Sequence, residues 1–158
     1  MYLYSLVMNN NDARERAAEI LNKSFRGNTI PLPVPLDYIC RENNIEVWTL
    51  PMKILDGLSS FEGGYCIFLN SRNYLPRFGF SQAHEMGHCF CGHVTAGYEF
   101  DARLKYISDC VANTFAASIM IPRSLRRLRP WTATSLAETC GVSLSAARIQ
   151  LEKWSKIA

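Results

Sequence analysis

The most constraining feature of the sequence is a pair of histidines four residues apart, His84 and His88, with Glu85 directly after the first. On an α-helix, residues i and i+4 lie one turn apart on the same face, so both imidazoles can bind one zinc ion. Glu85 lies one step round from His84 and can reach a water molecule beside that ion. The pattern therefore predicts a metal-activated water with Glu85 as general base. Two structural histidines beside an accidental glutamate are the less favoured alternative.

The residues around this pair favour a helix. Apolar or small residues recur at three- and four-residue steps along it: Phe80, Ala83, Gly87, Phe90 and Cys91. Ser81 is the predicted N-cap, and Gly92 is the predicted residue just after the helix end. Gly87 lowers helix propensity by roughly 1 kcal/mol relative to alanine. A glycine at this position indicates either close packing or space for a substrate.

Composition places the chain among ordinary globular proteins. Its 158 residues, 48% hydrophobic and 20% charged, predict a single domain over residues 1–158 with its own core. A net charge of +3 does not by itself indicate nucleic-acid binding. The sequence contains no run near the ~20 apolar residues of a membrane span. The N-terminus lacks the features of a signal peptide, so we expect a cytoplasmic protein whose six cysteines are reduced thiols.

Two helices are predicted ahead of the histidine pair. The first begins at Asp12, with Glu15 completing a capping box, and ends at Gly27. Residues 28–35 contain three prolines at alternate positions and predict an extended linker. A short helix over residues 36–43 follows.

A small sheet is predicted between these helices and the histidine pair. Residues 45–50 alternate apolar and polar side chains, which indicates a half-buried strand. Residues 58–62 and 65–69 flank two glycines and predict a hairpin. The expected fold class is therefore α+β, with a small, mostly antiparallel sheet of about three strands packed against several helices. A sheet edge beside the histidine helix can accept an extended peptide as an added strand.

Residues 107–121 predict a second helix that is apolar nearly all round and therefore buried. It carries one charged residue, Asp109. A buried carboxylate needs a partner, and a zinc ion is the best partner that the chain offers. Asp109 as third ligand would complete a catalytic site with one open position. The alternatives are that Asp109 caps its helix, or that Glu99 or Asp101 is the third ligand.

The C-terminal part predicts two further features. Four arginines crowd one segment: Arg123, Arg126, Arg127 and Arg129. A solvated basic face is the favoured interpretation, and a dock for an acidic partner or nucleic acid is the alternative. Residues 132–156 predict a helix-turn-helix-like segment within the domain. Its second helix presents few polar side chains, including Arg148, Gln150 and Lys153, so structural packing is favoured over DNA reading.

Three blocks of the sequence together resemble the ImmA/IrrE family of metallopeptidases. They are Arg77-x-Phe-x-x-x-x-His84-Glu-x-Gly-His88, Asp109-x-x-Ala-Asn-x-Phe-Ala116 and Met120-x-Pro122. The H-E-x-x-H pattern alone is shared by many peptidases, so the Ala-Asn-x-Phe-Ala block at this spacing is the more specific signal. The resemblance covers about residues 12–154.

This resemblance implies a zincin-like α+β fold, zinc held by His84, His88 and Asp109, and Glu85 as general base. The family usually has glutamate at the third ligand position, one methylene longer than Asp109. Family members often cleave a helix-turn-helix transcriptional repressor of stress or mobile-element genes. Because the chain has no room for its own repressor domain, we expect a separate repressor as partner, and neither nucleic acid nor a membrane.

The expected activity is that of a zinc endopeptidase. Glu85 takes a proton from the attacking water and passes it to the leaving amine. A second donor to the oxyanion is needed, and the candidates are His93, Tyr98 and Tyr106. Two alternatives stay open: a non-catalytic zinc-containing regulator that binds protein or DNA, and a component of a toxin–antitoxin pair.

Overall fold

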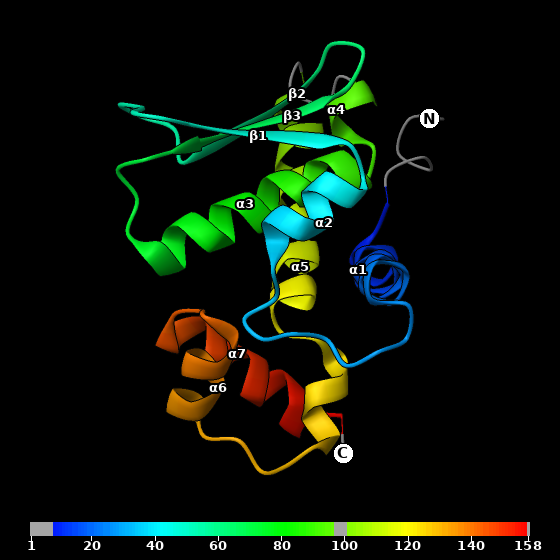
Figure 1. Cartoon of the computed structure of the whole chain (residues 1–158), viewed down its shortest axis with the longest axis vertical. Helices are drawn as coiled ribbons and strands as arrows, with labels where there is room; N and C mark the ends of the chain where they lie inside the picture. Colours follow the sequence, from blue (N-terminus) through cyan, green and yellow to red (C-terminus); the bar gives the residue numbers. More distant parts are fainter. Residues whose placement is uncertain (1–7, 97–100, 158) are drawn as a thin grey trace.

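In the computed structural model, which describes residues 8–96 and 101–157, a small sheet lies at one end of the molecule and helices fill the rest (Figure 1). The elements in chain order are α1 (Asn10–Phe25), α2 (Leu36–Glu42), β1 (Ile45–Leu50), β2 (Gly57–Phe61), β3 (Tyr65–Asn70), α3 (Leu75–Phe90), α4 (His93–Ala96), α5 (Ala102–Met120), the 3-10 helix η2 (Arg123–Arg127), α6 (Ala133–Cys140) and α7 (Leu144–Ser155). The α+β class is confirmed. Within the described ranges, no helix is both long and apolar enough to cross a membrane.

The three-stranded sheet is mixed, with strand order β1-β3-β2. The β2–β3 hairpin around Gly63 and Gly64 is antiparallel, as the sequence predicts. The β1–β3 pair is parallel, so the expectation of a mostly antiparallel sheet does not hold for that pair. The reason is topological: the chain crosses from β1 to the far edge to form β2, and the tight hairpin returns β3 into the middle. This order leaves β2 with one unpaired edge among the described residues.

Helices α1 and α3 begin earlier than their sequence patterns predict. The capping box of α1 is formed by Asn9 and Asp12 rather than by Asp12 and Glu15, because the Asn9 side chain accepts hydrogen bonds from the first backbone amides. Helix α3 already begins at Leu75, so Ser81 lies inside it and is not its N-cap. A proline in the first helical turn lacks only an amide that would be unpaired there anyway.

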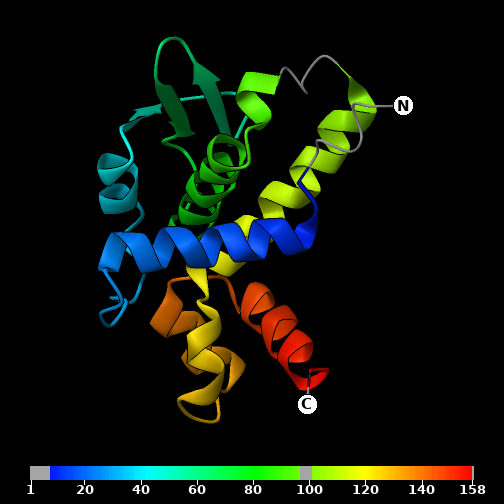
Figure 2. The same ribbon diagram turned by 90° about the vertical axis from the view of Figure 1, so that its right-hand side faces the viewer.

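The core lies where α3 is held between the sheet and α5. Ile67 of β3, Met86 of α3 and Phe115 of α5 are fully buried in one cluster. On the far side of α5, α1 crosses it, as Figure 2 shows. Helix α5 therefore contacts a helix on either side, which agrees with the buried helix predicted from its nearly continuous apolar composition.

At Gly87 the backbones of α3 and α5 lie close together. A Cβ atom at this position would lie 3.0 Å from the Cα and 3.1 Å from the carbonyl oxygen of Ala112. Close packing, and not space for a substrate, therefore explains the glycine between the two histidines. The backbone approach also sets how far the α3 side chains are from those of α5.

The predicted C-terminal helix pair forms as α6 and α7. Thr132 and Ser143 cap the two helices, and Gly141 joins them with a left-handed backbone at φ 65°. The helices pack against each other and bury Leu136 and Trp154. They lie at the opposite end of the molecule from the sheet (Figure 1).

The Gly87→Ala variant tests the close approach. The added methyl group meets the backbone of α5, a clash that outweighs the gain in helix propensity, so we expect the free energy of unfolding to fall by about 1–2 kcal/mol. Urea unfolding measures the change. Gly64→Ala is the control, because a Cβ there meets no atom within 4 Å. Equal stability of the two variants would contradict the packing role.

Candidate metal centre

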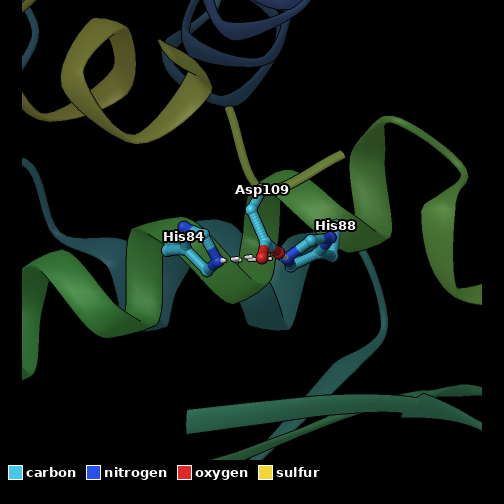
Figure 3. A group of neighbouring side chains, drawn as sticks. All are labelled: His84, His88 and Asp109. Atoms are coloured by element: carbon cyan, nitrogen blue, oxygen red, sulfur yellow. Dashed lines mark hydrogen bonds and ion pairs between the residues drawn. The ribbon is translucent and has the colours of Figure 1, made fainter. Parts of the chain in front are cut away.

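The two histidines and Asp109 meet at one point between α3 and α5 (Figure 3). His88 Nε2 lies 3.0 Å from His84 Nε2 and 3.3 Å from Asp109 Oδ1, and His84 Nε2 lies 3.9 Å from that oxygen. Ligand atoms bound tetrahedrally at zinc distances are about 3.3 Å apart. The three side chains therefore match the donor set and spacing of a three-ligand metal site.

Asp109 reaches this point from the middle of α5. The N-cap of that helix is Asp101, whose carboxylate accepts hydrogen bonds from the backbone amides of Arg103 and Leu104 at 2.9 and 3.0 Å. The structure thus excludes Asp109 as the cap and leaves Asp101 with a capping role. Glu99, the other alternative ligand, lies outside the described residues.

The Asp109 carboxylate is less isolated than its sequence context predicts. Its side chain is 34% exposed, and Lys105 Nζ lies 3.0 Å from Oδ2, one turn earlier on the same helix. The apolar pattern of the sequence predicts a helix start at Ile107, which makes Asp109 the one charged side chain of the helix. The helix begins at Ala102, so Lys105 belongs to it.

Each histidine contacts a further polar side chain through its other ring nitrogen. His84 Nδ1 lies 2.9 Å from Asn113 Oδ1, and His88 Nδ1 lies 3.0 Å from His93 Nδ1. An amide oxygen only accepts hydrogen bonds, so His84 carries its proton on Nδ1 and turns the Nε2 lone pair towards the site. Asn113 was part of the family block in the sequence. Its position four residues after Asp109, on the same helical face, was the signal for this contact.

The three candidate oxyanion donors have different placements. His93 is buried, with 2% of its surface exposed, and it contacts His88. Tyr106 is 70% exposed, and Tyr98 lies outside the described residues. An oxyanion role for any of them stays a prediction, and the position of His93 favours holding His88.

Glu85 is buried against β2. Ser59 of β2 and Glu85 line the same cavity, and a Cβ at Gly57 would lie 2.9 Å from Glu85 Cγ. Burial raises the pKa of Glu85 above its ordinary value, while Ser59 and the nearby His84 act to lower it. The carboxyl group is therefore a stronger base than an exposed glutamate.

Burial keeps two of the imidazoles neutral at pH 7. Burial, assisted by the neighbouring histidines, lowers the pKa of His88 to about 3, and burial likewise lowers the pKa of His93 to about 4. A neutral imidazole has a free lone pair, which metal binding requires. The 3.3 Å contact between His88 and Asp109 is consequently not an ion pair near neutral pH.

Two cavities flank Glu85. One, of about 170 Å³, is lined by Leu58 and Ser59 of β2 together with Glu85, His88 and Asp109. The other, of about 210 Å³, is lined by residues that include Asp56, Arg77, His84 and Glu85. An ion pair between Arg77 and Asp56, with Nε to Oδ1 at 3.1 Å, ties the start of α3 to the residue before β2. A carboxylate open to cavities on both sides can transfer a proton between groups bound there.

Comparison with known proteins adds two findings. The chain matches the Peptidase_M78 family, described as an IrrE N-terminal-like domain, over residues 40–152. A solved chain described as a Mycobacterium tuberculosis transcriptional regulator has a similar fold, with a TM-score of 0.62 and 18% sequence identity. The similarity covers 87% of this chain but 46% of that one, so this chain spans less than half the regulator's length. The curated proteins contain no match.

Asn113→Ala tests whether the amide orients His84. Without the acceptor the ring can turn, and we expect metal affinity to fall by about 10–100-fold. Competition with a chromophoric chelator measures this affinity. Asn113→Asp, which keeps an acceptor oxygen, should bind metal at least as tightly as the wild type. Unchanged affinity in Asn113→Ala would show that the contact does not hold the ring.

Acid should destabilise the metal-free protein. His88 and His93 bind protons from about pH 6.5 in the unfolded chain but only near pH 3 and 4 when folded, so their contribution is complete above pH 6.5 and is lost as the pH falls. The raised pKa of Glu85 opposes this trend. We expect urea unfolding with a chelator present to show lower stability at pH 5 than at pH 7, and a smaller difference in His93→Gln. An identical difference in that variant would contradict the assignment.

Proposed function

Because the chain belongs to the Peptidase_M78 family of metallopeptidase-type domains, we propose that it is a zinc-dependent endopeptidase. The observation that carries the proposal is the meeting of two imidazole Nε2 atoms and one carboxylate oxygen beside a buried glutamate. His84, His88 and Asp109 would hold the zinc ion. These are two nitrogen ligands and one oxygen ligand, the number of protein ligands that catalytic zinc sites use.

The protein's own residues perform the proton transfers. A bound zinc ion supplies a Lewis acid that polarises the scissile carbonyl and makes water more acidic. Glu85, whose pKa is raised by burial, accepts the proton of the attacking water and delivers it to the leaving amine. Ser59 and Gly57 hold the carboxylate between the two cavities, so it can face the water and the amine in turn.

The unpaired edge of β2 is the proposed binding surface for the substrate. An extended peptide can add to β2 as a further strand. Its backbone would then lie beside the cavity that Leu58, Ser59 and Glu85 line. Leu58 of β2 and Leu55, two residues before that strand, are each about half exposed and offer apolar contact for side chains of the peptide. Backbone pairing requires an unfolded segment, so the cleaved bond would lie in a loop or linker of the substrate.

The proposed substrate is a separate helix-turn-helix transcriptional repressor. The family resemblance of the sequence supports it. Cleavage of a repressor would release the genes that it controls.

The second candidate function is a non-catalytic regulator that binds DNA or an acidic partner through the C-terminal arginines. Arg123 and Arg127 are exposed on η2. Arg126 instead donates to the Ile157 carbonyl, and Arg129 lies 4.0 Å above the Trp131 ring, so two of the four serve the fold. This function requires DNA binding with a steep salt dependence. A toxin-like activity would instead show as growth arrest on expression that Glu85→Gln relieves.

Glu85→Gln separates these functions. The amide cannot accept a proton, so we expect zinc binding to be retained and cleavage to fall by about 10²–10⁴-fold or more. The zinc-loaded variant serves as bait in lysate of the source cells, with a chelator-treated sample and Glu62→Gln as controls. Mass spectrometry should find a repressor enriched only with zinc and only on Glu85→Gln.

Cleavage of a verified substrate by Glu85→Gln at the wild-type rate would exclude the mechanism. Capture of a protein or of DNA without zinc would favour the non-catalytic regulator.

A further inference from the structure

The two oxygens of Asp109 have different partners. Oδ1 faces the imidazoles, 3.3 Å from His88 Nε2 and 3.9 Å from His84 Nε2. Oδ2 lies 3.0 Å from the ammonium group of Lys105. One carboxylate therefore joins two functions, with one oxygen directed at the candidate metal site and the other paired with a cation.

Lys105 is held in this position by the geometry of α5. It lies four residues before Asp109 on the same helical face, so its side chain extends along the helix towards the carboxylate. Although 57% exposed, it lines the cavity that Glu85, His88 and Asp109 also line. An ordinary surface ion pair contributes little to stability, so the placement beside the site calls for another explanation.

We propose that Lys105 is a positioning residue that restricts Asp109 to binding the metal through one oxygen; this inference rests on the proposed zinc site. A carboxylate can bind a cation through one oxygen or through both. With both oxygens of Asp109 bound, two histidines and one aspartate would supply four donor atoms. A catalytic zinc site needs three protein donors and an open position. The Lys105 ammonium group keeps Oδ2 out of the coordination shell and so preserves that position.

Lys105 also affects how tightly the metal binds. The Lys105 ammonium group and the metal cation would contact the same carboxylate, and these two positive charges repel each other. Removal of the charge, with release of Oδ2, should therefore strengthen metal binding. Loss of a merely structural contact would have the opposite sign, because removal of a supporting partner usually weakens metal affinity by about 10–100-fold.

Cobalt(II) substitution tests the inference, because the visible absorption of protein-bound Co(II) weakens as its coordination number rises. The full chain is saturated with Co(II) as wild type, Lys105→Met and Lys105→Arg. Lys156→Met is the matched control, since Lys156, the C-cap of α7, forms an i,i+4 ion pair with Glu152 at 2.8 Å, away from the site. We expect Lys105→Met to lose visible absorption several-fold and to bind Co(II) several-fold more tightly. Lys105→Arg and Lys156→Met should match the wild type.

The outcomes distinguish the inference from the function on which it rests. A wild-type Co(II) spectrum in Lys105→Met, with or without weaker binding, would overturn the positioning role of Lys105 and leave the metal site standing. Lost peptide cleavage with an unchanged spectrum would likewise overturn it, because Lys105 would then act on the substrate. Failure of the wild-type protein to bind Co(II) would overturn the proposed metal site and the inference together.

Discussion

The contact between Gly87 and Ala112 is the constraint on which the rest of the structure depends. It allows the backbones of α3 and α5 to approach closely enough for a short aspartate on one helix to reach the histidines on the other. The sheet on one side of α3 and α1 on the far side of α5 hold the two helices in this position. The chemistry of the site is therefore set by a backbone contact as much as by the polar side chains themselves.

The polar groups around this contact act in pairs. Asn113 and His93 fix the two imidazoles through their outer nitrogens, and burial keeps His88 neutral. Ser59 and the backbone at Gly57 confine Glu85. The candidate ligands and Glu85 are thus each held by a second group, which would reduce the reorganisation needed on substrate binding if the proposed activity holds.

Local patterns allowed much of this to be predicted from the sequence. The spacing of His84 and His88 requires a helix, and the single carboxylate in an apolar stretch identified Asp109 as a residue in need of a partner. In the structure, the candidate ligand atoms of His84, His88 and Asp109 lie close together. The strands over residues 45–50, 58–62 and 65–69 could also be predicted from the sequence, because each has its own apolar pattern and adjacent turn residues.

The parts that sequence reasoning missed depend on contacts between distant segments. The parallel β1–β3 pair follows from the path of the chain across the sheet, which no local pattern encodes. The role of Ser59 arises only when β2 packs beside α3. The apolar pattern predicts a start for α5 at Ile107, five residues too late, so the sequence does not reveal the ion pair between Lys105 and Asp109.

The three candidate ligand side chains come from two separate helices, which would have a consequence for the protein's lifetime. An ion that binds only the folded protein would link α3 to α5. It would raise the free energy of unfolding by about 2.7 kcal/mol when the free ion concentration is 100 times the dissociation constant. Metal supply would then control how much intact protein a cell retains as well as how fast that protein works. Metal starvation would lower activity twice, through vacant sites and through proteolysis of opened chains.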